Sequence, residues 1–207
     1  MIPFLPFLCV ITDKALCPVS LAEKALEGGA AMIQLRHKSA SGGQLFSWAI
    51  EIVNCCKRYN ALCIINDRVD IAMASKADGV HLGQQDMPAT VARKIMGKNT
   101  IIGVSTSSIE EAILAEKDGA DYIGFGHIYP TLSKEKGHSP LGPEALQEVS
   151  KLISLPIVAI GGISLDNAAS LISCGASGVA VISAVSRAVD PSRAAQMLVS
   201  AIKKRNS

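Results

Sequence analysis

The sequence predicts one (β/α)₈ barrel, a TIM barrel, that spans residues 1–207 as a single α/β domain. Short β-branched and apolar runs alternate with longer stretches of helical periodicity, and eight such pairs fit the chain. Most of the expected strands lack polar alternation, which is typical of parallel strands buried on both faces. The glycine fingerprint that follows the first strand of a dinucleotide-binding sheet is absent, so the closed barrel is favoured over a doubly wound sheet.

Glycines separate the expected helices from the strands that follow them. Gly119 and Gly175 each follow a helical pattern, just before the next expected strand, where a helix C-terminus commonly has glycine. The expected strands are Leu8–Thr12, Met32–Arg36, Leu62–Asn66, Gly79–Leu82, Ile101–Ser105, Tyr122–Gly126, Ile157–Gly161 and Gly178–Ser183. The expected helices are Leu21–Leu26, Gln44–Tyr59, Asp70–Ser75, Pro88–Met96, Ile109–Lys117, Pro143–Ile153, Asp166–Ser173 and Ala194–Lys203. Barrel enzymes place their active sites at the carboxyl ends of the strands, so the polar residues there are the functional candidates.

Composition excludes several classes of function. The net charge is only +2 and no Lys/Arg run is present, so neither a nucleic-acid surface nor a membrane surface is expected. No apolar run approaches the roughly 20 residues of a membrane helix. The apolar first eight residues lack the basic region of a signal peptide, and we expect them to lead into the first strand. Six cysteines without a CxxC pair predict reduced, structural thiols and a cytoplasmic location.

Three polar residues near the end of the second strand form the first candidate site. Strand alternation sends Gln34, Arg36 and Lys38 to one side of the chain. An amide, a guanidinium and an ammonium that converge there could hold a polyanion such as diphosphate. The alternative is a solvated loop with one surface ion pair. Three polar groups on one face of an apolar strand favour the anion site.

Two aspartates follow the third and fourth strands. Because these strand ends are neighbours in a barrel, Asp67 and Asp86 could share a Mg²⁺ that also contacts phosphate oxygens. Each aspartate alone fits a cap equally well, and Asp67 could cap a helix that starts near Val69. Their joint position beside the cationic residues favours the metal site. Asp70 and Asp78 have no such neighbours and are expected to be structural.

The remaining strand ends supply hydroxyls and main-chain amides. Ser105 ends the fifth strand, and a role as helix N-cap is the alternative. The long loop after the sixth strand contains Thr131, Ser133 and Lys134, two hydroxyls and a cation suited to phosphate. After strands seven and eight come Gly162, Ile182 and Ser183, where many barrels bind phosphate. The sequence thus predicts a metal-assisted anion site over strands two to four and a metal-free one over strands seven and eight.

The motifs at these strand ends resemble those of one family. They are Gln34-Leu35-Arg36-His37-Lys38, Ile65-Asn66-Asp67-Arg68, Gly79-Val80-His81-Leu82-Gly83-Gln84-Gln85-Asp86, Gly126-His127-Ile128-Tyr129-Pro130-Thr131-Leu132-Ser133-Lys134 and Ala159-Ile160-Gly161-Gly162-Ile163. In this order they resemble the thiamine-phosphate synthase family over nearly the whole chain.

The resemblance implies a Mg²⁺-dependent transferase of thiamine biosynthesis. It would couple 4-amino-2-methyl-5-hydroxymethylpyrimidine diphosphate with 4-methyl-5-hydroxyethylthiazole phosphate, giving thiamine phosphate and diphosphate. The implied ligands of the pyrimidine diphosphate are Gln34, Arg36, Lys38, Asn66, Ser105 and Lys134, of which Arg36, Ser105 and Lys134 are the implied catalytic residues. The implied ligands of the thiazole phosphate are Thr131, Ser133, Gly162, Ile182 and Ser183, and Asp67 and Asp86 would hold Mg²⁺. The implied partners are these small molecules, without nucleic acid or membrane, and a possible homodimer.

His127 leaves a second function open. The related thiazole tautomerases share the barrel and a Gly-His before the sixth loop, and they use that histidine as general acid and base. Tautomerases tend to lose the diphosphate and metal residues, which are all present here, so the resemblance favours the synthase. A non-catalytic binder of phosphorylated ligands is a third possibility, disfavoured because no ligand-binding position is blank. His37 and Ser133 depart from common family residues, and Ser133 keeps a hydroxyl.

Overall fold

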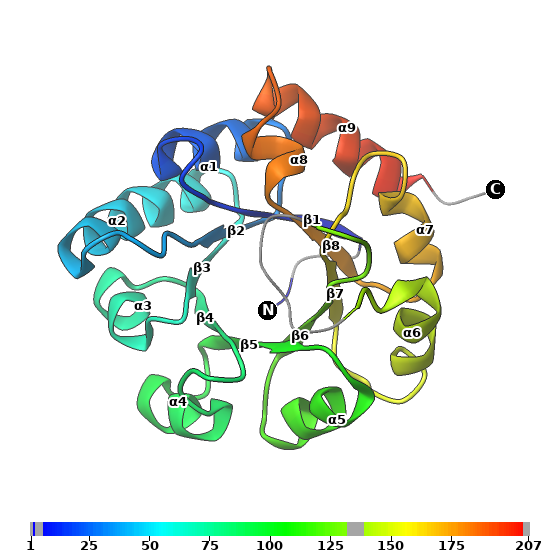
Figure 1. Cartoon of the computed structure of the whole chain (residues 1–207). Helices are drawn as coiled ribbons and strands as arrows, with labels where there is room; N and C mark the ends of the chain where they lie inside the picture. The colour runs from blue at the N-terminus through cyan, green and yellow to red at the C-terminus, as the bar shows by residue number, and fades with distance from the viewer. Residues whose placement is uncertain (1, 3–5, 132–138, 205–207) are drawn as a thin grey trace.

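The computed structural model describes residue 2 and residues 6–131 and 139–204, and within these ranges eight parallel strands close into a barrel (Figure 1). The strands are β1 (Phe7–Ile11), β2 (Met32–Leu35), β3 (Leu62–Asn66), β4 (Gly79–Leu82), β5 (Ile101–Thr106), β6 (Tyr122–Gly126), β7 (Ile157–Ile160) and β8 (Gly178–Val181). Each pairs with its neighbours in the sequence, and β8 returns to β1 with Gly178 opposite Phe7. The predicted (β/α)₈ fold is therefore confirmed.

Helices connect successive strands and surround the barrel. They are α1 (Pro18–Glu27), α2 (Gly42–Arg58), α3 (Val69–Ser75), α4 (Ala89–Met96), α5 (Ile109–Lys117), α6 (Gly142–Val149), α7 (Ala168–Ser173), α8 (Ser183–Ser186) and α9 (Pro191–Lys203). Figure 1 shows α9 beside α1, where it closes the ring of helices. The short helix α8 directly follows β8 and was not expected from the sequence. No helix in the described part of the chain is long and apolar enough to cross a membrane.

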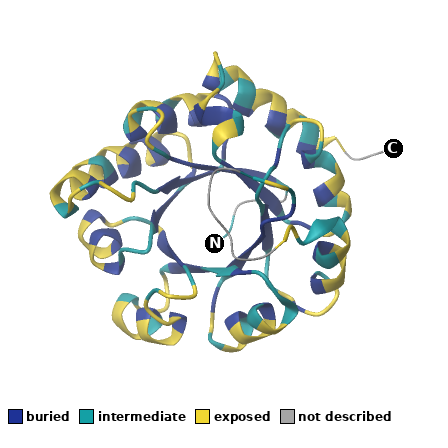
Figure 2. Cartoon of the chain, viewed as in Figure 1, coloured by how far each residue is buried: buried dark blue, intermediate teal, exposed yellow. Residues whose placement is uncertain are grey.

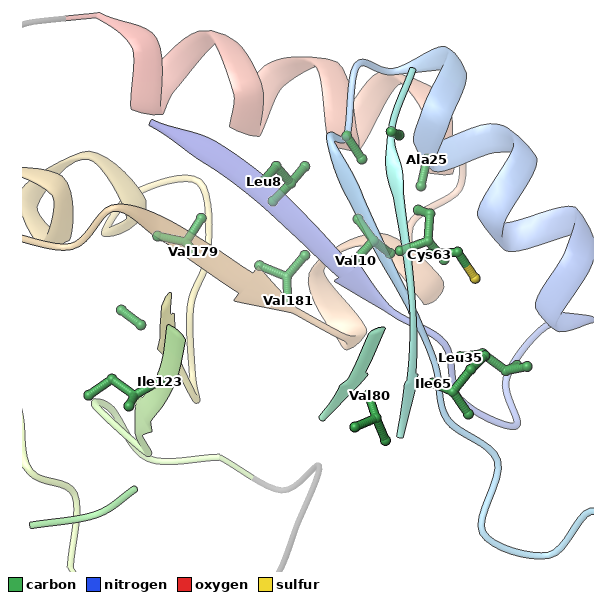
Figure 3. Packing of buried hydrophobic residues seen from close by; sticks show 14 of the residues in the cluster. Leu8, Val10, Ala25, Leu35, Cys63, Ile65, Val80, Ile123, Val179 and Val181 are labelled. Atoms are coloured by element: carbon green, nitrogen blue, oxygen red, sulfur yellow. The ribbon is translucent and has the colours of Figure 1, made fainter. Parts of the chain in front are cut away.

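The alternation of side chains along each strand produces two apolar layers. Leu8 and Val10 of β1 point outward and pack against the helices, as Figure 3 shows. Phe7, Cys9 and Ile11 point inward and fill the barrel with residues from the other strands. Figure 2 shows the result, with strands mostly buried and helices buried mainly on their inner faces. Burying a large apolar side chain contributes about 1.5–3 kcal/mol, so these layers are the main source of stability.

Three side chains at the amino ends of the strands tie neighbouring strands together. Asp78, which precedes β4, accepts a hydrogen bond of 2.8 Å from the N–H of Cys63 in β3. Asp121 precedes β6 and accepts one of 2.7 Å from Ile102 in β5. Ser177 precedes β8 and accepts one of 3.3 Å from the first residue of β7. These groups lie at the rim opposite the strands' carboxyl ends, where polar residues serve stability. The structural role predicted for Asp78 is thus confirmed.

Local side-chain bonds shift two helix boundaries from the predicted ones. α7 begins at Ala168 instead of Asp166 because Asn167 holds the preceding turn: its Oδ1 accepts from Ser164 N at 2.9 Å, and its Nδ2 donates to Gly162 O at 3.0 Å. α6 ends at Val149, not Ile153, and Ser150 Oγ donates to Gln147 O at 2.9 Å beyond it. Neither shift moves a strand end.

Candidate active site

A cavity opens inside the barrel toward the carboxyl ends of the strands, and every strand contributes to its wall. The lining residues within the strands are Cys9, Ile11, Gln34, Asn66, His81, Ser105, Tyr122, Gly124, Gly126, Val158, Ile160 and Ala180. Those that follow a strand's carboxyl end are Arg36, His127, Thr131, Gly161 and Ile182. The predicted residues Gln34, Arg36, Asn66, Ser105, Thr131 and Ile182 therefore meet around one space.

The deep part of the cavity contains the thiol of Cys9 and the phenol of Tyr122 among apolar side chains. Burial raises the pKa of the Cys9 thiol to about 12. Burial likewise raises the pKa of Tyr122 well above its usual range, although the nearby Gln34 side chain acts to lower it. Both groups therefore stay protonated at neutral pH. A ring that entered this part of the cavity would meet apolar atoms and neutral donors.

One wall of the cavity carries a chain of three hydrogen-bonded side chains from adjacent strands. His81 Nδ1 lies 3.0 Å from the Tyr122 hydroxyl, and His81 Nε2 lies 2.9 Å from Ser105 Oγ. Gly103 makes this arrangement possible, because a Cβ there would lie 2.1 Å from Tyr122 Cζ. Ser105 is thus held within the wall and is not the N-cap of α5, a role that Ser108 fills by accepting from Glu111 N.

The carboxylate pair lies at the ends of β3 and β4. The carboxyl groups of Asp67 and Asp86 are within hydrogen-bonding reach of each other. Asp67 N donates to His81 O at 2.8 Å, and Asp86 Oδ2 accepts from Gly83 N at 2.7 Å. α3 begins after Arg68 without a side-chain cap, so the alternative that Asp67 caps this helix is wrong. Asp67 has a φ of 64°, a left-handed conformation that aspartate tolerates better than most residues.

The electrostatics of the pair indicate a place for a cation. Burial, with the hydrogen bond and negative charge of Asp86, raises the pKa of Asp67 to about 6. Lys38 and Arg36 are close enough for their charges to lower it. Two adjacent carboxylates repel each other unless a proton or a cation lies between them. Asp70, by contrast, pairs with Arg68 at the surface, as its predicted structural role requires.

A second, smaller cavity adjoins the first over β7 and β8. Its lining includes the predicted residues Thr131, Gly162, Ile182 and Ser183. Thr131 and Ile182 line both cavities, so the two spaces share a wall. Gly162 has a φ of 66°, and a Cβ there would lie 2.5 Å from Pro130 O. Glycine at this position thus lets the main chain of the loop after β7 pack closely against Pro130, and α8 begins at the edge of the cavity.

The structure brings most of the predicted site together. Ser133 and Lys134 lie outside the described residues. Asp67, Asp86 and Lys38 do not line the main cavity, and Lys38 lies near the carboxylate pair. The sequence reasoning missed His81 and Tyr122 as site residues. Their inward position in the alternation, opposite the small residues Gly124 and Gly103, is the signal that could have found them.

The barrel and its cavity define a (β/α)₈-barrel enzyme that has a carboxylate pair and cationic side chains at its strand ends. A family model described as thiamine monophosphate synthase matches residues 8–185. The chain therefore belongs to the thiamine monophosphate synthase family.

Individual relatives agree with the family. The chain is 58% identical over 204 residues to the thiamine-phosphate synthase of Chlorobium limicola, covering 99% of this chain and 97% of the relative. It is 60% identical over 199 residues to that of Chlorobium phaeovibrioides, covering 96% and 95%. Thiamine phosphate pyrophosphorylase from Pyrococcus furiosus matches in structure with a TM-score of 0.89 at 43% identity, covering 95% of each chain. These matches support the synthase over the tautomerase alternative. A 3-hexulose-6-phosphate synthase, at 19% identity and a TM-score of 0.68, shows the shared fold alone.

Proposed function

We propose that this enzyme transfers the pyrimidinylmethyl group of 4-amino-2-methyl-5-hydroxymethylpyrimidine diphosphate to the nitrogen of 4-methyl-5-hydroxyethylthiazole phosphate. The products are thiamine phosphate and diphosphate. The observation that carries the proposal is the contact between Asp67 and Asp86 beside Arg36 and Lys38, in a barrel that has a second cavity over β7 and β8. Such a layout suits two phosphorylated substrates, of which one loses diphosphate.

The carboxylate pair fits Mg²⁺. This ion commonly takes one or two carboxylates and completes its shell with water and substrate phosphate oxygens. Among the described residues no group of three His, Cys, Asp or Glu could hold a metal. Asp67 and Asp86 would hold the Mg²⁺ ion, and the ion would stabilise the charged form of Asp67, whose pKa is raised by burial and by the hydrogen bond and negative charge of Asp86. The bound ion would supply charge neutralisation for the departing diphosphate.

The side chains divide into two binding sets. Arg36, Lys38 and Lys134 would neutralise the diphosphate, while Gln34, Asn66 and Ser105 would hold the pyrimidine part in the main cavity. Thr131, Ser133, Gly162, Ile182 and Ser183 would bind the thiazole phosphate through hydroxyls and main-chain amides. Because Thr131 and Ile182 line both cavities, the thiazole nitrogen could approach the pyrimidine methylene across their shared wall.

The chemistry needs no protein nucleophile. The C–O bond to the diphosphate breaks and its electron pair leaves with the diphosphate, which gives a methylene cation stabilised by the pyrimidine. The thiazole nitrogen then forms the C–N bond with its lone pair. Arg36, Ser105 and Lys134 are the proposed catalytic residues because they would contact the leaving group or the ring. The apolar floor and neutral Tyr122 would keep water from the cation.

A coupling assay tests the proposal. The protein is incubated with both substrates and Mg²⁺, and release of diphosphate and formation of thiamine phosphate are followed together. We expect equal amounts of both products, and none without Mg²⁺ or with Asp67→Asn. Asp70→Asn, at the surface ion pair, is the matched control and should retain activity. Absence of turnover, with thermal stabilisation by both substrates, would identify a binder instead.

The six free thiols fit a reducing, cytoplasmic location, and a homodimer stays a prediction.

A further inference from the structure

Thr12 is a buried threonine that lies directly after β1 and has no assigned role in the site proposed above. Its side chain is fully excluded from solvent. Its hydroxyl accepts a hydrogen bond of 2.9 Å from Arg36 N and donates one of 3.1 Å to Arg36 O. Both main-chain polar groups of Arg36 are thus bound by one side-chain atom.

These bonds extend the pairing of β1 and β2 beyond the strands. Within the ladder, Ile11 lies opposite Gln34, and Thr12 N donates to Gln34 O at 2.9 Å. In a parallel ladder the next bond would run from Arg36 N to a main-chain carbonyl of the neighbouring strand. The Thr12 hydroxyl takes the place of that carbonyl, and it also satisfies Arg36 O. A hydroxyl has one donor and two acceptor positions, which allows both bonds at once.

The main chain that Thr12 fixes belongs to Arg36, whose cationic side chain faces the cavity. The Arg36 side chain lines the main cavity, and its charge acts on Asp67. Thr12 itself is not among the described residues that line that cavity. It is therefore placed to act on the anion site only through Arg36.

We propose that Thr12 is a positioning residue that fixes Arg36 for binding the diphosphate group. This inference rests on the proposed function, in which Arg36 contacts the leaving group. Without the hydroxyl, the segment after β2 would lose two hydrogen bonds at the residue from which the guanidinium extends. The main chain of Arg36 would then be held less rigidly. The guanidinium would be less well positioned, and binding of the diphosphate would weaken.

The barrel contains a matched control for this threonine. Thr106 is the last residue of β5 and is also buried, with 2% of its surface exposed. Its Oγ1 has no hydrogen-bond partner among the described residues. Thr106→Val therefore makes the same change of side chain at the same end of the barrel without removing a bond.

The test measures binding of inorganic diphosphate in the presence of Mg²⁺ by titration calorimetry. Thr12→Val should raise the Kd about tenfold, as expected for loss of hydrogen bonds that position a charged group. Thr12→Ser, which keeps the hydroxyl, should stay within about threefold of the unchanged protein, and Thr106→Val should not change Kd. In an Arg36→Ala background, Thr12→Val should have no further effect, because the threonine acts through Arg36.

Two results would overturn the inference. One is an unchanged Kd in Thr12→Val, and the other is an equal loss in Thr12→Val with and without Arg36. If Thr12→Val does not fold, Thr12→Cys provides a weaker donor and acceptor of similar size, and its Kd should lie between those of Thr12→Ser and Arg36→Ala. The coupling assay separates the two proposals. Diphosphate binding that depends on Thr12 without thiamine phosphate formation contradicts only the proposed function, whereas coupling without that dependence contradicts only the role of Thr12.

Discussion

His81 Nε2 lies 2.9 Å from Ser105 Oγ and links the ends of two neighbouring strands inside the cavity. The other ring nitrogen of the same histidine contacts the Tyr122 hydroxyl at 3.0 Å. The Ser105 hydroxyl therefore has a direction set by the barrel wall and does not rotate freely. If Ser105 contacts the substrate as proposed, His81 determines the orientation of the Ser105 hydroxyl in that contact.

Replacing His81 by Phe should lower kcat/KM for the pyrimidine diphosphate about tenfold, because Ser105 loses the partner that orients it. The KM for the thiazole phosphate should not change. Steady-state kinetics with each substrate varied in turn measures both effects. Ser105→Ala should give a loss of similar size, and the double variant should be no worse than the single ones. Additive losses would contradict the coupling of the two residues.

Asp67→Asn should stabilise the metal-free protein at neutral pH. The pKa of Asp67 is raised to about 6 from an ordinary value of 3.8, so the folded state binds the proton more tightly than the unfolded state. Stability should therefore fall as pH rises from about 4 to about 6 and stay reduced above that range. Asparagine removes this dependence and tolerates the left-handed conformation at position 67.

Thermal unfolding between pH 4 and pH 8 without Mg²⁺ measures this difference. The control is Asp70→Asn, which breaks only a surface ion pair and should change stability by less than about 1 kcal/mol. The same slope of stability with pH in the unchanged protein and in Asp67→Asn would show that Asp67 is not the group responsible.

Mg²⁺ should bind more weakly as pH falls below about 6, because the ion must displace the proton that Asp67 retains there. Titration calorimetry of Mg²⁺ in the presence of inorganic diphosphate, at pH 5, 6 and 7.5, measures the change. Chelation of the metal should stop release of diphosphate from the substrate at every pH. Affinity that is constant across this range would place the metal away from Asp67.

Much of this site follows from the sequence because a closed parallel barrel brings all carboxyl strand ends to one rim. Once eight strands are recognised, Gln34, Asp67 and Ser105 must lie around one opening, although they are far apart in the chain. Side-chain alternation then places Gln34 and Arg36 on the inner side. Both now line the cavity.

The features of the site that could not be predicted from the sequence depend on contacts between strands. His81 reads as one polar residue in an apolar strand, and its partners Ser105 and Tyr122 come from two other strands. The role of Thr12 depends on a hydrogen bond to a residue 24 positions away. The helix α8 has only four residues, too few for a helical period to appear.

Gly103→Ala should destabilise the protein and disturb the cavity wall. The added Cβ would lie 2.1 Å from Tyr122 Cζ, so the ring or the strand must move. Overpacking of this kind typically costs about 1–3 kcal/mol. Chemical denaturation measures the loss. Gly43→Ala is the control because nothing lies within 4 Å of its Cβ position in α2, and there alanine should be neutral or slightly stabilising. Equal stability of both variants would contradict the close approach at Gly103.

Ser183→Ala should raise the KM for the thiazole phosphate while leaving the KM for the pyrimidine diphosphate unchanged. Ser183 lines only the smaller of the two cavities, at the start of α8. Loss of one hydrogen bond to a charged phosphate costs about 1.5–3 kcal/mol, so KM should rise by about tenfold or more. Arg36→Ala should show the opposite pattern, because Arg36 lines only the main cavity. Varying each substrate against a saturating level of the other separates the two effects. If either variant raises both KM values equally, the two phosphorylated groups do not occupy separate cavities.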